Sequence, residues 1–82
     1  MKEGNIFVDT NIIVYAYDAS SGEKHSKALK IMKDLWGTGN GITSIQVLQE
    51  IFVSVTGKIA KPLSIITAKE IVKDFLKWKT VI

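Results

Sequence analysis

A short apolar segment that ends in a carboxylate, followed at once by a second apolar segment, most constrains the fold of this chain. Residues 5–9 read Asn-Ile-Phe-Val-Asp, with the β-branched and aromatic side chains typical of a buried strand. Thr10 and Asn11 separate this segment from Ile12–Tyr17, which is apolar on every side. We therefore expect a strand followed directly by a buried helix, with Thr10 or Asn11 as the helix N-cap.

The length of the chain allows one domain at most. Its 82 residues are expected to bury only about 60% of the unfolded surface, which leaves a thin margin of stability. The sequence has no cysteine, which excludes disulfides, zinc–thiolate sites and thiol nucleophiles. The longest apolar stretch is far shorter than the roughly 20 residues of a membrane span, and the first residues lack a signal-peptide pattern. We therefore expect a soluble cytoplasmic protein.

Helix and strand patterns alternate along the rest of the sequence. Helices are expected from residue 23 to about 36, from about 44 to 56, and from 64 or 67 onward. Ser/Thr-x-x-Glu/Gln patterns predict capping boxes at residues 20–23, 43–46 and 67–70. Ile42–Thr43 and residues 78–82 leave room for two short strands. This order predicts an α/β fold with a short parallel sheet and helices on both faces.

The charge of the chain is modestly basic, with eleven lysines, no arginine and a net charge of +3. A solvated surface explains this charge, and contact with a polyanion is the alternative, because lysine neutralises phosphate without reading bases. The absence of arginine argues against bidentate base recognition. A small lysine-rich nucleic-acid-binding module unrelated to nucleases would fit the charge alone.

Two carboxylates, Asp9 and Glu50, stand out because their sequence neighbours are apolar. Asp9 lies at the carboxyl end of the predicted first strand, where open α/β sheets bind their ligands. Glu50 lies in the middle of a predicted helix, and Lys58, the nearest lysine along the chain, is two turns away. An ionised carboxylate in such surroundings is costly unless it is paired or bound to a cation. Hard oxygen ligands, with no thiols and His25 as the one imidazole, favour Mg²⁺ or Mn²⁺ over zinc.

A purely structural explanation fits the same two carboxylates. Asp9 would cap the helix that follows it, and Glu50 would face water. Physical chemistry alone leaves both explanations open. His25 is interpreted as a helix-surface residue, and Tyr15 and Tyr17 as part of the core.

Two longer segments carry a family resemblance. Residues 6–18 read Ile-Phe-Val-Asp-Thr-Asn-Ile-Ile-Val-Tyr-Ala-Tyr-Asp, and residues 42–50 read Ile-Thr-Ser-Ile-Gln-Val-Leu-Gln-Glu. They resemble the opening motif and the second motif of the PIN-domain nucleases, especially the VapC-like toxins of toxin–antitoxin pairs. In the second motif, a helix that starts with a small polar residue carries a metal-binding glutamate. The resemblance extends over nearly the whole chain.

The resemblance implies an endoribonuclease in which clustered carboxylates hold Mg²⁺ or Mn²⁺. The ion polarises the scissile phosphate and activates the water that attacks in line. Asp9 and Glu50 would bind the metal directly or through water, and Thr10 would donate its hydroxyl to the site. Asn11 would orient Asp9 or the turn beneath it, and Gln46, one helical turn before Glu50, would support the glutamate. RNA is the implied substrate and an antitoxin protein a possible partner.

The family domain continues well past the length of this chain, and its remaining acidic residues lie in that second half. We therefore expect residues 1–82 to be the N-terminal portion of a single PIN-like domain that lacks the C-terminal half and supplies part of the site. The alternative is a catalytically inactive PIN remnant that binds protein or RNA. The uncovered edge of the Ile6–Val8 strand and the small core also predict a homo-oligomer.

Overall fold

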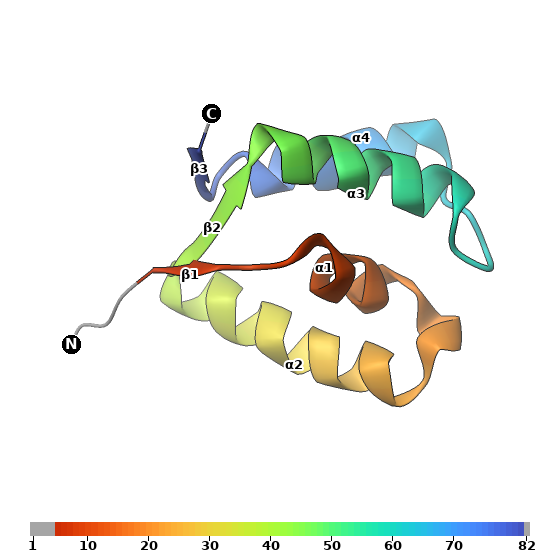
Figure 1. Cartoon of the computed structure of the whole chain (residues 1–82), viewed down its shortest axis with the longest axis horizontal. Helices are drawn as coiled ribbons and strands as arrows, with labels where there is room; N and C mark the ends of the chain where they lie inside the picture. Colours follow the sequence, from red (N-terminus) through yellow and green to blue (C-terminus); the bar gives the residue numbers. More distant parts are fainter. Residues whose placement is uncertain (1–4, 82) are drawn as a thin grey trace.

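The computed structural model of the chain describes residues 5–81 and contains a three-stranded parallel sheet and four α-helices (Figure 1). The strands are β1 (Ile6–Phe7), β2 (Gly41–Ser44) and β3 (Lys79–Val81). The helices are α1 (Thr10–Tyr17), α2 (Glu23–Thr38), α3 (Ile45–Gly57) and α4 (Ile65–Phe75), with a 3₁₀ turn at Ala19–Ser21. The predicted α/β class and parallel sheet are confirmed. Within residues 5–81, no helix is both long enough and apolar enough to span a membrane.

The sheet has β2 in the centre, with β1 and β3 parallel to it on either side. Phe7 pairs with Ile42, and the Val8 N–H donates to the Ile42 carbonyl at 3.4 Å. β1 is an edge strand, and the side chains of Ile6 and Phe7 are 53% and 55% exposed. The predicted exposure of apolar side chains at this edge is therefore confirmed for Ile6 and Phe7. Val8, by contrast, is buried in the core.

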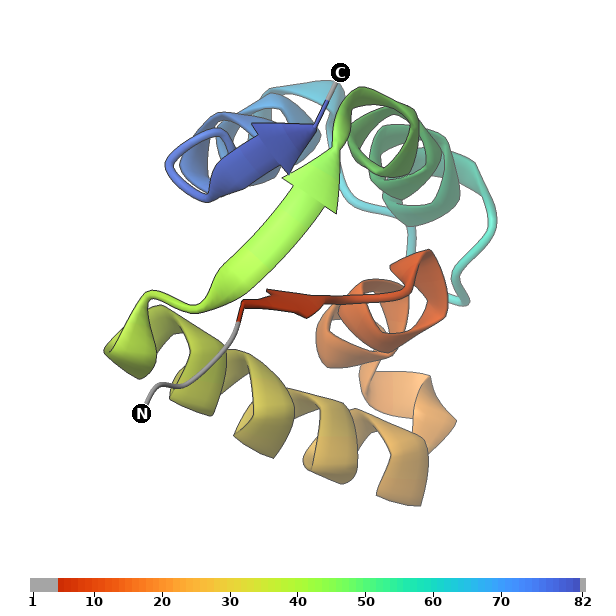
Figure 2. The same ribbon diagram turned by 60° about the vertical axis from the view of Figure 1, so that its left-hand side comes forward.

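Helices cover both faces of the sheet, as predicted. α1 and α2 lie together on one side of β2, and α3 and α4 lie together on the other (Figures 1 and 2). All four helices and β2 supply buried side chains, so one core joins the two layers. The side chains with no exposed surface are Ile13, Thr43, Ile51, Val55, Ala68 and Phe75. Burial of this apolar surface is the main force that holds the short strands together.

An aromatic cluster of Trp36, Phe75 and Trp78 lies at the amino-terminal end of the strands. The ring of Phe75 is 4.8 Å from that of Trp78 and 5.5 Å from that of Trp36. Trp78 also covers Gly41, the first residue of β2, so closely that a Cβ at this position would lie 2.6 Å from the indole ring. Glycine is therefore required at this position by packing. The cluster fastens the end of α2 to the end of α4 and the start of β3.

Two helix starts differ from the capping-box predictions. Ser44 caps α3 in place of Thr43, and its hydroxyl accepts the Val47 N–H at 3.1 Å. Thr43 lies within β2, where its side chain is fully buried. Ser64, one of the two predicted starts of α4, caps that helix by accepting the Thr67 N–H at 3.1 Å. Ser44 and Ser64 each occupy the last extended position before a helix. A side chain at that position can reach the free N–H groups of the first turn.

The starts of α1 and α2 also lie elsewhere than predicted. α1 begins at Thr10, so Asp9 occupies the N-cap position that was predicted for Thr10 or Asn11. α2 begins after Gly22, which makes no side-chain cap. The hydroxyl of Ser20, the predicted cap, instead donates to Asp18 at 2.6 Å. The Ser20 hydroxyl is therefore bonded to the Asp18 carboxylate and does not cap α2.

Candidate active site

An open pocket of about 480 Å³ lies between the start of α1 and one face of α3. We call it the carboxylate pocket. Its lining residues are Asp9, Thr10, Asn11, Gln49, Glu50, Val53, Ser54 and Lys58. It opens at the carboxyl end of β1, the position that the rule for open α/β sheets predicts. All four predicted site residues line it, although they come from segments far apart in the sequence.

Asp9 stands at the N-cap of α1 without acting as a side-chain cap. Its backbone is extended, with φ −64° and ψ 144°, and its carbonyl oxygen accepts the N–H of Ile12 at 3.1 Å. The carboxylate makes no capping hydrogen bond and is exposed. The purely structural explanation, in which the carboxylate caps the helix, is therefore wrong for Asp9. The side chain remains accessible to a ligand in the pocket.

A side-chain hydrogen bond joins the two segments that form the pocket. The Thr10 hydroxyl donates to Oε1 of Glu50 at 2.9 Å, across a separation of 40 residues. Glu50 is exposed, which confirms the alternative prediction that it faces water and contradicts the apolar surroundings expected for it. Its neighbours Val47 and Ile51 point into the core, while Glu50 lies on the solvent-facing side of α3. The hydrogen bond therefore links the start of α1 to Glu50 on α3 at one site.

Sequence reasoning missed four residues that line the pocket, and Lys58 is the charged one among them; the others are Gln49, Val53 and Ser54. The local spacing suggested that no cation lies near Glu50, yet Lys58 lines the same pocket. Its N–H donates to the Ser54 carbonyl at 2.9 Å and closes the last turn of α3. Ser54 and Lys58 follow Glu50 by four and eight residues, a spacing that places all three on one face of a helix. That periodicity was the signal that could have identified the lysine.

Three other predicted residues have separate outcomes. Asn11 is exposed at the pocket, and its role in orienting Asp9 stays a prediction. Gln46 is exposed but does not line the pocket, where Gln49 lies instead. His25 lies outside the pocket on α2, with Nδ1 2.8 Å from the carbonyl oxygen of Tyr15. This contact joins α2 to α1, so His25, predicted as a helix-surface residue, is partly buried between the two helices.

The donors in the pocket suit a hard divalent cation. Carboxylate oxygens of Asp9 and Glu50, the hydroxyl of Thr10 and the amide oxygen of Asn11 are the ligand types that Mg²⁺ and Mn²⁺ prefer. In the part of the chain that the structure describes, no three His, Cys, Asp or Glu side chains group closely enough to hold a metal ion. Asp9 and Glu50 line the same pocket, and a cation held by both would keep most of its water ligands.

Comparison with protein families agrees with this geometry. The PIN domain family model matches residues 6–80, which include both segments that form the carboxylate pocket. Neither a curated protein nor a solved structure matches the chain. PIN domains are generally nucleases and typically use divalent metal ions. Since the match extends over far more than half of the sequence, the chain belongs to the PIN domain family.

Proposed function

We propose that this chain takes part in the metal-dependent endonucleolytic hydrolysis of RNA phosphodiester bonds. The observation that carries the proposal is the hydrogen bond from Thr10 to Glu50, because it joins the β1–α1 segment to α3 at the pocket. Asp9 and Glu50 consequently line one pocket at the carboxyl end of the sheet. Membership of a family whose domains are generally nucleases supports the same reaction class.

In this proposal, Asp9 and Glu50 hold Mg²⁺ or Mn²⁺. The bound ion supplies Lewis acidity to the scissile phosphate and to the attacking water. Thr10 fixes Oε1 of Glu50 through its hydroxyl and leaves Oε2 free for another partner. Asn11 lies next to Thr10 at the pocket and offers an amide to orient Asp9 or the substrate.

The pair of carboxylates is too small a ligand set for tight metal binding. Mg²⁺ gives up its waters reluctantly, and two carboxylates leave most of an octahedral shell to water. We propose that this chain supplies only part of the site and that further acidic ligands come from outside residues 5–81. Calorimetric titration of the chain with Mn²⁺ should therefore show loose binding at best. Tight binding of one ion, abolished by Glu50→Ala, would show instead that the pocket is complete.

A second candidate function is that of an inactive PIN module which binds RNA or protein. It is favoured by the absence, within residues 5–81, of any group of three potential metal ligands. In that case the chain would bind RNA without cutting it, and Asp9 and Glu50 would contribute little to the affinity.

The proposed partners extend beyond RNA. A VapC-like toxin would be cytoplasmic and would bind an antitoxin, and we include both in the proposal. The half-exposed side chains of Ile6 and Phe7 on an edge strand support association with another copy of the chain. Light scattering at several concentrations tests this association. A dilution-stable monomer would contradict it.

Cleavage of a defined RNA by the full chain, with Mg²⁺, with Mn²⁺ or with chelator, tests the proposed reaction. Asp9→Asn removes a charge without changing side-chain size and should abolish any cleavage while the circular dichroism spectrum stays unchanged. The matched control is Asp34→Asn, at an exposed residue of α2 outside the pocket, which should cleave normally. Cleavage that survives Asp9→Asn would mean that the site is misplaced. Binding without cleavage in Mg²⁺ and in Mn²⁺ would mean that the chain does not cleave RNA by itself, which fits both an incomplete site and the inactive module.

A further inference from the structure

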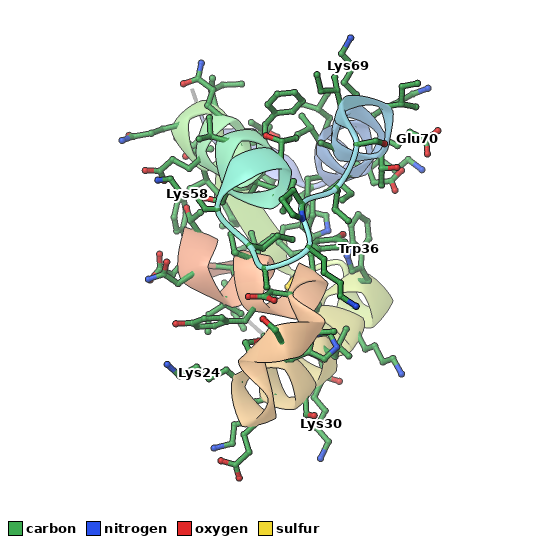
Figure 3. All side chains as sticks on the ribbon, turned by 90° about the vertical axis from the view of Figure 1, so that its right-hand side faces the viewer. Lys24, Lys30, Trp36, Lys58, Lys69 and Glu70 are labelled. Atoms are coloured by element: carbon green, nitrogen blue, oxygen red, sulfur yellow. The ribbon has the colours of Figure 1, made fainter. Side chains whose placement is uncertain are left out.

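Lys58 introduces a positive charge into a pocket otherwise defined by carboxylates. It lines the same pocket as Asp9 and Glu50, although it follows Glu50 by two helical turns. In Figure 3, Lys24 and Lys30 project from α2 and Lys69 from α4, whereas Lys58 lies where α3 meets α1. Lys58 is thus placed at the candidate site while the three other labelled lysines are directed elsewhere.

The main chain around Lys58 is held in place, while its side chain is free to reach into the pocket. The Lys58 N–H is bonded to Ser54, and the N–H of the following residue, Ile59, also donates to the Ser54 carbonyl, at 3.3 Å. Ile59 is buried in the core with 7% of its surface exposed. The Lys58 side chain is exposed. The fold therefore fixes the origin of the side chain and leaves the ammonium group available to a ligand.

The charge balance of the pocket indicates what this ammonium group binds. Asp9 and Glu50 alone would repel a phosphodiester. A divalent cation held by the pair would cancel their two charges and leave the pocket neutral. Lys58 then makes the pocket net positive, which attracts a phosphate and keeps it there. Lysine suits this task because it acts on phosphate as a compact point charge.

We infer that Lys58 is a substrate-binding residue that holds an RNA phosphate at the carboxylate pocket. This inference rests on the proposed function and adds the residue that selects a polyanionic substrate. Lys58 makes no contribution to base recognition, so it increases affinity for RNA uniformly across sequences.

The positive charge of Lys58 could also stabilise the fold, and this structural role must be distinguished from phosphate binding. Lys58 is the C-cap of α3, where a cation interacts favourably with the negative end of the helix dipole. That role would change thermal stability and leave RNA affinity untouched. Measurement of RNA binding, rather than of folding alone, therefore distinguishes the two.

The test is fluorescence anisotropy of the full chain, with Asp9 and Glu50 intact, and a single-stranded phosphorothioate RNA oligonucleotide that resists cleavage, in Mg²⁺. Lys58→Gln should weaken binding roughly three- to tenfold and reduce the slope of log affinity against log salt by about 0.7. Lys58→Arg should restore both values. The matched control is Lys61→Gln, because Lys61 lines a separate hollow beside Tyr17 and Leu63; its effect should be clearly smaller.

Two results would overturn the inference. Equal losses of RNA affinity for Lys58→Gln and Lys61→Gln would mean that RNA binds to basic side chains spread over the surface and not to a site at Lys58. A lowered melting temperature with unchanged binding would assign Lys58 to the helix dipole. The proposed function has a separate outcome: if binding depends on Lys58 but the parent chain cleaves no RNA in Mg²⁺ or Mn²⁺, the chain does not act as a nuclease by itself and the phosphate site stands. Absence of any RNA binding would refute both.

Discussion

The two ends of the parallel sheet are built from opposite kinds of side chain. At the amino-terminal end, the aromatic cluster includes Phe75, which is fully buried, and Trp78, which is 7% exposed. At the carboxyl end, Asp9 and Glu50 are exposed, and within residues 5–81 a single hydrogen bond, from Thr10 to Glu50, connects the walls of the pocket. Stability and chemistry are therefore separated along the strand direction. Substitutions at one end should unfold the chain, and those at the other should leave it folded.

The largest effect is expected for Phe75→Ala. Phe75 contacts both tryptophans of the aromatic cluster and has no exposed surface, so truncation should cost about 3–5 kcal/mol of unfolding free energy. A domain of this size has few kilocalories to lose, so we expect a largely unfolded chain at room temperature. Circular dichroism with urea titration measures the change. Leu76→Ala, at a side chain that is 54% exposed, is the control; an equal loss there would contradict the separation.

Gly41→Ala should give the next largest loss. The added Cβ would lie 2.6 Å from the indole of Trp78, and overpacking of this kind costs about 1–3 kcal/mol. Gly37→Ala makes the matched control, because a Cβ there, in the last turn of α2, meets no atom within 4 Å. Alanine at that position should stabilise the helix, by less than the roughly 1 kcal/mol typical of a helix interior. Opposite signs for the two glycines are expected in urea denaturation, and equal signs would refute the packing argument.

The sequence was sufficient to predict the order of elements and the edge where the pocket lies. The apolar segment at Ile6–Val8 and the one at Ile12–Tyr17 differ in length and in their flanking residues, which distinguishes a strand from a helix. Parallel strands align their carboxyl ends, so Asp9 was correctly placed at that edge. These inferences depend only on local pattern and on the topology that it implies.

Inferences that required side-chain direction were less successful. Thr43 and Ser44 are neighbours with similar capping chemistry, but β2 turns Thr43 into the core, so only Ser44 reaches the start of α3. Glu50 was expected among apolar side chains because its sequence neighbours are apolar, whereas the helix places them on another face. Lys58 was judged distant from Glu50 because eight residues separate the two along the chain. Tertiary packing decides which face of a helix or strand contacts its neighbour. The composition of a short segment does not determine that face.

Thr10→Val tests the pocket end of the comparison. Valine keeps the shape of threonine but removes the hydroxyl that donates to Glu50, so the unfolding free energy should fall by only about 1 kcal/mol or less. Under the proposed function, RNA cleavage should fall far more, because the Glu50 carboxylate loses its fixed orientation. Thr10→Ser retains the donor and should recover most of the activity. Assays of cleavage and urea denaturation on the same samples check this; unchanged cleavage by the valine variant would show that the hydrogen bond has no functional part.

The smallest effect is expected at Tyr17, the last residue of α1. Burial raises the pKa of Tyr17 above its ordinary value of 10.0, and the negative charge of Asp74 raises it further. Below pH 10 the phenol is neutral in both folded and unfolded chains, so its contribution to stability is fully present. As the pH rises above that value, the unfolded chain ionises first, and stability falls until the folded pKa is passed. Tyr17→Phe should therefore weaken the alkaline loss of stability seen in urea titrations between pH 9 and pH 11, with Tyr15→Phe as the matched control. An identical alkaline slope in the parent chain and Tyr17→Phe would show that this phenol does not couple to folding.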